Sequence, residues 1–210
     1  MKASEAGQQR EVLLVDDDDA VRDALSWLFE GNGFRVRAFE SGEAVLACPE
    51  VVAAAGCLVL DMRLSGISGL VLFERLTTGG RCPPVLFLTG HADVPLAVAA
   101  LKMGAADFLE KPFDDEVLLA RVGDCLQRDS ERRNARAGRE RVDAALRQLT
   151  DREREVMQHV LAGRLNKQIA EALDISIKTV EVHRSRVLEK MGVKSAVELA
   201  GLLASWPPLE

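Results

Sequence analysis

Cys57-Leu58-Val59-Leu60-Asp61 is the stretch that decides the fold of the first half of this chain, because a short apolar run stops there at a carboxylate. An apolar run of this length, followed by Gly66, is typical of a strand buried on both faces of a parallel sheet. Asp61 then lies at the carboxyl end of the strand, where ligands bind in open α/β sheets. Capping of the next helix is the commoner role for an isolated aspartate in this position, so this stretch alone does not establish a site.

Three other apolar runs also end in residues that can bind a ligand. These runs and the residues after them are 12–15 with Asp16 to Asp19, 85–88 with Thr89, and 107–110 with Lys111. If the strands are parallel neighbours, their carboxyl ends meet at one edge of the sheet. That edge gathers three acids, a hydroxyl and an ammonium, namely Asp16, Asp17, Asp61, Thr89 and Lys111. These groups together predict a site of phosphoryl transfer.

Length and composition favour a soluble intracellular protein. At 210 residues, of which 48% are hydrophobic, the chain suits two domains of ordinary size or one large one. Its apolar runs are much shorter than the roughly 20 residues of a membrane span, and the polar first residues lack the apolar core of a signal peptide. The four cysteines form no Cys-x-x-Cys pair, which disfavours a zinc cluster and suits a reducing compartment. We therefore expect a cytoplasmic protein with no membrane partner.

The net charge differs between the two halves of the chain. Residues 1–125 contain 20 Asp and Glu against 11 Lys and Arg, whereas residues 126–210 contain 13 against 16. An acidic front half is typical of a metal or phosphate switch, and a mildly basic back half suits a module that meets a polyanion.

The order of elements through residue 127 predicts an α/β fold. Strand and helix patterns alternate, beginning with a helix that Asp18 or Asp19 can cap and including one helix from Ser41 toward Pro49. Five such βα units predict a doubly wound, flavodoxin-like sheet of five parallel strands. Residues 128–147 are polar and rich in Ala, Arg and Glu, which predicts a partly helical linker. A solvated connector explains its arginines more simply than direct DNA contact does.

Residues 148–210 have a purely helical pattern. Thr150-Asp151-Arg152-Glu153 and Ser195-Ala196-Val197-Glu198 are capping boxes, in which a hydroxyl and a later Glu satisfy the first helical turn. Asn166 and Ser176 are expected to cap two further helices, and Gly192 to end the longer one. Four compact helices with short turns predict an all-α helix-turn-helix module.

Three motifs give this chain a family resemblance. Thr89-Gly90-His91-Ala92-Asp93-Val94-Pro95-Leu96-Ala97-Val98 and Asp107-Phe108-Leu109-Glu110-Lys111-Pro112-Phe113 are similar to the receiver domain of two-component response regulators, and Lys178-Thr179-Val180-Glu181-Val182-His183-Arg184 is similar to the LuxR-type helix-turn-helix. Their order resembles the FixJ-like branch of the LuxR/NarL class. This implies a receiver domain over 1–127 with strand order 2-1-3-4-5, a linker over 128–147 and a DNA-binding domain over 148–210.

The resemblance also implies a role for each polar residue of the crevice. Asp61 would be the phosphoacceptor, taking a phosphoryl group from a sensor histidine kinase. Because a carboxylate is a weak nucleophile, catalysis would rest on positioning and charge neutralisation. Mg²⁺ would supply most of this, held by Asp16, Asp17, Asp61 and the Arg63 carbonyl. Lys111 and Thr89 would bind phosphoryl oxygens, although each seen singly would be a surface charge or a turn hydroxyl.

Two departures from the family pattern affect the same region. Receivers often have Pro and Asp where this chain has Ser65 and Gly66, so we expect a less constrained loop after Asp61. The switch aromatic, a tyrosine in many receivers, is Phe108 here. Without a phenol, it is expected to respond to phosphorylation only through packing.

Phosphorylation of Asp61 would add negative charge and strong hydrogen-bond acceptors. The resemblance implies that Thr89 and Phe108 then move toward the phosphoryl group and reshape the surface formed by residues 94–103 and the Phe108 strand. In the family this surface pairs two receivers, so we expect a homodimer of the phosphorylated form. The surface can also release a masked second domain. The chain would catalyse only its own phosphorylation and dephosphorylation, so we do not expect an enzyme.

The helix from Ser176 to Met191 is expected to enter the major groove of double-stranded promoter DNA. Its core face would consist of Ile177, Val180, Val187, Leu188 and Met191. The outward residues would be Lys178, Glu181, Val182, Ser185, Arg186 and Glu189. Of these, Glu181, Val182 and Ser185 could contact base edges. The expected phosphate contacts are Lys167, Lys178, Thr179, Arg184 and Lys194. Because the module is only slightly basic, dimerisation on paired half-sites should decide occupancy. RNA polymerase is a further candidate partner.

Two other functional classes stay open. A Mg²⁺-dependent phosphohydrolase with an aspartyl nucleophile usually has a second Asp two residues later as general acid, but this chain has Arg63 there; turnover of free phosphoesters would support that class. A protein-interaction switch would dock its helical part on another protein. Salt-dependent binding of duplex DNA separates it from a DNA-binding regulator.

Overall fold

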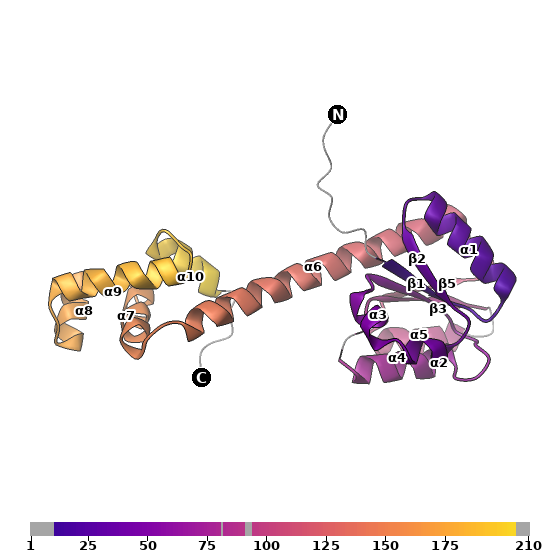
Figure 1. The fold of residues 1–210 in the computed structure, drawn as a ribbon, viewed down its shortest axis with the longest axis horizontal. Coiled ribbons are helices and arrows are strands. Elements are labelled where there is room, and N and C mark those ends of the chain that lie inside the picture. Colours follow the sequence, from indigo (N-terminus) through magenta and orange to yellow (C-terminus); the bar gives the residue numbers. More distant parts are fainter. Residues whose placement is uncertain (1–10, 81, 91–93, 205–210) are drawn as a thin grey trace, which may run out of the picture. The chain divides into compact units, whose positions relative to one another are not determined.

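The computed structural model describes residues 11–80, 82–90 and 94–204, and the chain divides into two compact units between Arg133 and Asn134 (Figure 1). The first unit contains a five-stranded sheet in the order β2-β1-β3-β4-β5, and all neighbouring strands are parallel. Its strands are β1 (Glu11–Val15), β2 (Arg35–Phe39), β3 (Cys57–Asp61), β4 (Val85–Thr89) and β5 (Asp107–Glu110). The predicted fold class and strand order are therefore confirmed.

Different helices cover the two faces of the sheet. They are α1 (Asp19–Gly31), α2 (Gly42–Leu46), α3 (Pro49–Ala54), α4 (Gly69–Thr78), α5 (Val94–Lys102) and the first part of α6 (Asp115–Arg147). Successive strand residues point to opposite faces. Val12 and Leu14 pack in the core with α1 and α6, whereas Leu13 and Val15 pack in the core with α2 to α5. Figure 1 shows α1 and α6 on one face and α3, α4 and α5 on the other.

The central strand β3 carries Asp61 out of the core. Its four preceding residues, Cys57, Leu58, Val59 and Leu60, are fully buried. Strand β3 pairs with β1 on one edge and β4 on the other. On one face, the rings of Phe73 and Phe87 meet edge to face, with centroids 5.6 Å apart, a contact worth about 1 kcal/mol beyond its buried area. A strand held on both edges and both faces gives the following carboxylate a defined position.

Two helices of this unit differ from the sequence prediction. We expected one helix from Ser41 toward Pro49, but α2 ends at Leu46 and α3 begins at Pro49. Proline has no N–H with which to continue a helix, yet it fits the first position of a new one. We also expected residues 128–147 to be only partly helical, whereas α6 runs unbroken from Asp115 to Arg147. Gly138 opposes helix by only about 1 kcal/mol, and the Ala, Arg and Glu around it favour helix.

The second unit contains four helices after α6, as predicted for a helix-turn-helix module. They are α7 (Asp151–Leu161), α8 (Asn166–Leu173), α9 (Ile177–Lys190) and α10 (Ala196–Ala204). Their core contains Val156, Ile169, Val180, Val187 and Leu199, together with residues from the end of α6. None of the described helices in either unit is both long enough and apolar enough to cross a membrane.

Helix caps in this unit agree only partly with the sequence prediction. Ser176 caps α9, because its hydroxyl accepts from the Thr179 N–H. Asn166 was expected to cap α8, but the cap is Leu165 and its N–H is satisfied by the Gln168 side chain at 2.9 Å. At α10, Ser195 accepts from the Glu198 N–H as predicted, whereas the Glu198 carboxylate accepts from the Lys194 N–H and not from Ser195.

A buried ion pair joins α7 to α9 at the predicted capping box of Thr150. Glu153 is 2% exposed, and its Oε2 accepts from the Thr150 N–H at 2.9 Å and from Lys190 Nζ at 2.7 Å. The Lys190 ammonium and then the Thr150 N–H lower the pKa of Glu153 from 4.5 to about 2. The same carboxylate therefore closes a helix cap and fixes α7 against α9.

This pair predicts acid sensitivity of the second unit. Because the folded pKa of Glu153 is depressed, its contribution to stability is present above pH 4.5 and lost as the pH falls toward about 2. The substitution Glu153→Gln should flatten this part of the pH dependence, measured by hydrogen exchange of α7 and α9 amides in the full chain. Glu155→Gln, at a solvent-exposed acid of the same helix, should keep the parental dependence. An unchanged profile in Glu153→Gln would contradict the assignment.

Candidate functional site

Asp16, Asp61 and Lys111 meet at the carboxyl edge of the sheet. They follow or end strands β1, β3 and β5, and β4 lies between the last two. Lys111 Nζ donates to Asp61 Oδ2 at 2.5 Å and to Asp16 Oδ2 at 3.0 Å. The Asp16 and Asp61 side chains are only 1% and 13% exposed. Two carboxylates therefore lie largely out of water and share one ammonium.

The charges of this cluster depend on one another. Burial raises the pKa of Asp61, and hydrogen bonds from Lys111 and the Arg63 N–H offset only part of that rise. The Arg63 N–H reaches Asp61 Oδ1 at 2.9 Å. Burial by itself would lower the pKa of Lys111, but Asp61 and Asp16 outweigh it, and the net shift is upward. Lys111 is consequently a cation at neutral pH that offsets the repulsion between two acids.

Asp17 is hydrogen-bonded to the loop that follows Asp61, and Lys111 acts on it only through its charge. Its Oδ2 accepts from the Ser65 N–H at 2.9 Å, and hydrogen bonds from the Ser65 hydroxyl and N–H lower the pKa of Asp17. Among the residues that the structure describes, no three His, Cys, Asp or Glu side chains are grouped so as to hold a metal ion. Mg²⁺ nevertheless needs only one or two carboxylates besides water, and all the acids here offer the hard oxygens it prefers. In donor chemistry, the residues present therefore fit Mg²⁺.

Thr89 and Phe108 lie on the strands beside the crevice. Thr89 is fully buried; its hydroxyl donates to the Gly90 carbonyl at 3.1 Å, and its own carbonyl accepts from the Lys111 N–H at 2.8 Å. Phe108 is half-buried and packs against the core on the α2 to α5 face. Residues 91–93, which belong to the motif beginning at Thr89, lie outside the described residues. The hydroxyl and the aromatic ring thus sit on adjacent strands, β4 and β5.

Helix α9 presents the predicted outward face to solvent. Its exposed residues include Lys178, Glu181, Val182, Ser185 and Arg186. On the opposite side Val180 and Val187 are buried, as is Met191 just after the helix, and Leu188 is half-buried. The prediction for Ile177 was wrong, because this side chain is 47% exposed. Ile177 is the first residue of α9, and a helical side chain points toward the N-terminus, here past the end of the packed face.

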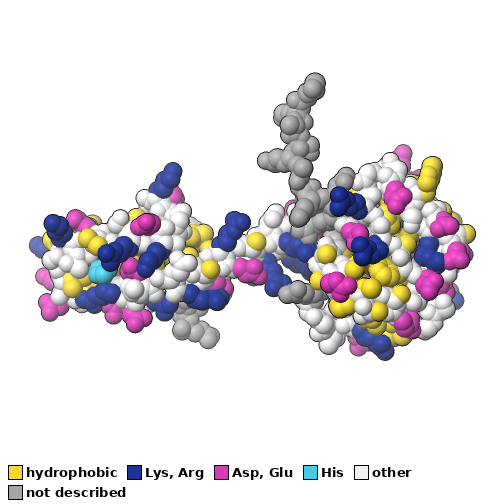
Figure 2. Space-filling view, in the orientation of Figure 1, with side chains coloured by type: hydrophobic (Ala, Val, Ile, Leu, Met, Phe, Trp, Pro, Cys, Tyr) yellow, Lys and Arg dark blue, Asp and Glu magenta, His cyan; other side chains and the backbone are white. Residues whose placement is uncertain are grey.

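The expected phosphate contacts fall into two groups. Lys167, Lys178 and Lys194 are exposed. Thr179 and Arg184 are half-buried and already bound within the unit: the Thr179 hydroxyl is 2.8 Å from that of Ser176, and Arg184 Nη1 donates to Asn166 Oδ1 at 3.1 Å. Basic and acidic side chains are interspersed on the face of this unit seen in Figure 2.

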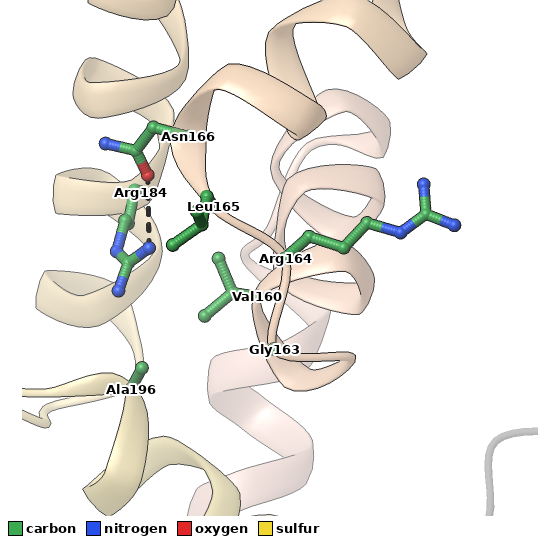
Figure 3. Close-up of a pocket in the computed structure, with 7 residues that line it drawn as sticks. All are labelled: Val160, Gly163, Arg164, Leu165, Asn166, Arg184 and Ala196. Carbon is green, nitrogen blue, oxygen red and sulfur yellow. Dashed lines mark hydrogen bonds between the residues drawn. The ribbon is translucent and has the colours of Figure 1, made fainter.

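Arg184 lies at a hollow between α7, α8, α9 and α10. The residues that line it are Val160, Gly163, Arg164, Leu165, Asn166, Arg184 and Ala196. Figure 3 shows Asn166 and Arg184 joined across its edge, while Arg164 points away from it. The sequence predicted only a capping role for Asn166 and not its bond to Arg184. The two residues are 18 positions apart on different helices, so no local pattern marks them as partners.

Known proteins match both units. The family model described as the response regulator receiver domain matches residues 12–123, and that of bacterial regulatory proteins of the luxR family matches residues 147–203. The chain is 47% identical over 191 residues to the C4-dicarboxylate transport transcriptional regulatory protein DctR of Rhodobacter capsulatus, covering 90% of this chain and 96% of that protein. It is 44% identical over 201 residues to the transcriptional regulatory protein FixJ of Azorhizobium caulinodans, covering 95% of each.

Solved structures agree with these sequence matches. The response regulator StyR superposes with a TM-score of 0.85 at 40% identity, covering 94% of this chain and 100% of that one. Full-length FixJ from B. japonicum gives a TM-score of 0.59 at 38% identity, covering 94% and 97%. The resemblance to FixJ-like regulators is confirmed.

Lys111→Met is predicted to destabilise the first unit, because Asp16 and Asp61 would face each other without a cation. We expect a loss of about 1–2 kcal/mol, less than for a fully buried pair, since the Lys111 side chain is 31% exposed. Added Mg²⁺ should restore more stability in this variant than in the parent. Urea unfolding followed by circular dichroism measures both effects. Lys102→Met, at an exposed lysine on α5, is the control; equal stability of the two variants would contradict the role of Lys111.

Proposed function

Because this chain belongs to the response regulators that join a receiver domain to a LuxR-type DNA-binding domain, we propose that it accepts a phosphoryl group on Asp61 and binds promoter DNA in response. The observation that carries the proposal is the placement of Asp61 at the end of a fully buried strand, with Oδ2 on Lys111 and Oδ1 on the Arg63 N–H. The site supplies one acceptor carboxylate with a defined position and a cation beside it.

The phosphoryl donor would be a phosphohistidine of a sensor kinase. A carboxylate oxygen of Asp61 attacks phosphorus, the phosphorus–nitrogen bond breaks, and an acyl phosphate forms. Receiver domains bind Mg²⁺ at this site; here Asp16, Asp17, Asp61 and the Arg63 carbonyl would hold the ion, which neutralises charge on the phosphoryl oxygens. Lys111, which now offsets two acids, would pair with one phosphoryl oxygen, and the Thr89 hydroxyl would donate to another.

We propose that the only turnover is self-phosphorylation and hydrolysis of the acyl phosphate on Asp61. The family is one of transcriptional regulators. Position 63, where an aspartyl phosphohydrolase carries a general acid, is Arg63. An arginine does not give up its proton, so it cannot protonate the leaving group of a free phosphoester.

The phosphorylated form would be a homodimer. Four apolar side chains on α5 and just after its end support this, because they are 37–45% exposed: Leu96, Val98, Leu101 and Met103. Helix α5 packs beside β4 and β5, which carry Thr89 and Phe108. Movement of Thr89 and Phe108 toward the phosphoryl group would therefore reach this surface. We assign residues 1–127 to the receiver, 128–147 to the connector and 148–210 to DNA binding, with RNA polymerase as a further partner.

We propose that α9 reads DNA in the major groove. Glu181, Val182 and Ser185 are exposed on one side of the helix and can meet base edges, with Arg186 beside them. Lys167, Lys178 and Lys194 would bind phosphates, together with Thr179 and Arg184. The hydrogen bond that Arg184 donates to Asn166 holds the guanidinium in place, which lowers the entropy lost when it binds a phosphate.

Asp61→Asn is predicted to abolish the response to phosphodonor. The amide is close in size to the carboxylate but is not a nucleophile, so the variant should take up no phosphoryl group and stay monomeric. Sedimentation and DNA affinity, each measured with and without a small phosphodonor and Mg²⁺, test this. Asp23→Asn, at an exposed acid on α1, is the control and should respond as the parent does. Dimerisation of Asp61→Asn by the donor would disprove the assignment.

Two substitutions are predicted to affect DNA binding in different ways. Glu181→Ala should relax base preference at one position, at a cost of about 1–3 kcal/mol for the preferred base. Lys167→Ala should weaken all sequences alike and reduce the salt slope by about one. Binding to a library of duplexes at several salt concentrations distinguishes the two. A uniform loss in Glu181→Ala would show that α9 does not read bases through that residue.

A further inference from the structure

The loop between β3 and α4, residues 62–68, carries part of the proposed phosphoryl site. Its first half is tied to the site acids, because the Arg63 N–H donates to Asp61 and the Ser65 N–H donates to Asp17, each at 2.9 Å. The Ser65 bond is specific to a chain that lacks proline at this position, since proline has no N–H. We expected a less constrained loop because of Ser65. The loop instead has a hydrogen bond to Asp17 that a proline at this position could not form.

The second half of the loop rests on Glu43 of α2. Glu43 Oε1 accepts from the Ile67 N–H at 3.1 Å. Gly66 has φ +90, and a Cβ there would lie 2.7 Å from Glu43 Oε1, so the Gly66 backbone passes directly against this carboxylate. Only glycine adopts that conformation readily while allowing this approach.

Gly42, the neighbour of Glu43, makes a second contact with the loop. A Cβ at Gly42 would lie 2.6 Å from Ile67 Cγ1, so the Ile67 side chain occupies the space that a larger residue would fill. Ile67 also packs against the core on this face of the sheet. A hydrogen bond, a close backbone approach and a side-chain contact therefore seat residues 66–67 on residues 42–43.

We propose that Glu43 is a positioning residue for phosphoryl transfer, which holds the loop so that the Arg63 carbonyl and Asp17 can bind Mg²⁺ beside Asp61. This inference rests on the proposed function. Glu43 itself would not touch the phosphoryl oxygens. It acts on them through the Gly66–Ile67 backbone, while Asp17 and Asp61 hold the other end of the same loop.

The contact is too exposed to matter mainly for stability. Glu43 lies at the surface, and a solvent-exposed hydrogen bond contributes about 1 kcal/mol or less to folding. By contrast, substitution of a residue that orients metal ligands typically weakens metal affinity 10- to 100-fold. The effect of Glu43 should therefore appear in Mg²⁺ affinity and not in the unfolding midpoint.

The experiment compares Glu43→Ala with Glu43→Gln in the full chain. Calorimetry measures the Kd for Mg²⁺ alone, and phosphorylation by a small phosphodonor is followed over a range of Mg²⁺ concentrations. Glu43→Ala should raise the Kd about 10-fold and slow phosphorylation at low Mg²⁺, with the rate recovering at saturating Mg²⁺. Glu43→Gln keeps a carbonyl that accepts from Ile67 and should stay within about twofold of the parent.

One control variant and the parent chain separate the possible outcomes. Glu50→Ala removes an exposed acid from α3 and should behave as the parent, which excludes an effect of net charge. A Kd within about twofold of the parent in Glu43→Ala, or an equal loss in Glu43→Gln, would overturn the inference. If the parent itself takes up no phosphoryl group on Asp61, the proposed function fails instead, and the calorimetry still reports whether Glu43 controls Mg²⁺ binding.

Discussion

The first unit depends on one interaction at the carboxyl edge of its sheet. Asp16 and Asp61 share the ammonium of Lys111 there. Two largely buried carboxylates repel each other, and each also loses its hydration. Lys111, which follows β5, offsets both costs. If the Lys111 ammonium moves from the acids to a phosphoryl group, the two acids need another positive charge beside them. Mg²⁺ would supply that charge. Binding of the metal and binding of the phosphoryl group would therefore be coupled through the charges of the site.

The second unit uses the same physical device for a structural purpose. Glu153 is as buried as Asp16 and has Lys190 as its cation, but its other partner is the Thr150 N–H at a helix terminus. Around Glu153 the hydrogen bonds from Lys190 and the Thr150 N–H outweigh burial, and the pKa is low; around Asp61 burial outweighs the hydrogen bonds from Lys111 and the Arg63 N–H, and the pKa is raised. The contrast separates a carboxylate that fastens two helices from the one proposed to accept the phosphoryl group.

The sequence was sufficient for the features that depend on local pattern. Apolar runs ending in polar residues predicted the strands of the parallel sheet and which of their ends would meet, and the contacts among Asp16, Asp61 and Lys111 follow from that topology. Caps at Thr150 and Ser176 were also predictable, because a hydroxyl three residues before its N–H donor is a local signal. What the sequence could not reveal were bonds between distant segments: Ser65 to Asp17, Ile67 to Glu43, Lys190 to Glu153 and Arg184 to Asn166. The connector was predicted to be only partly helical, whereas residues of high helix propensity continue α6 through all of it in spite of Gly138.

The most direct test of this account is to locate the phosphoryl group itself. The parent chain is treated with a small phosphodonor and Mg²⁺, reduced with borohydride, which converts an aspartyl phosphate to homoserine, and sequenced by mass spectrometry. The account predicts homoserine at position 61 and at no other acid of the crevice. Homoserine at position 16 or 17, or a phosphoryl group carried elsewhere in the chain with position 61 unchanged, would contradict it.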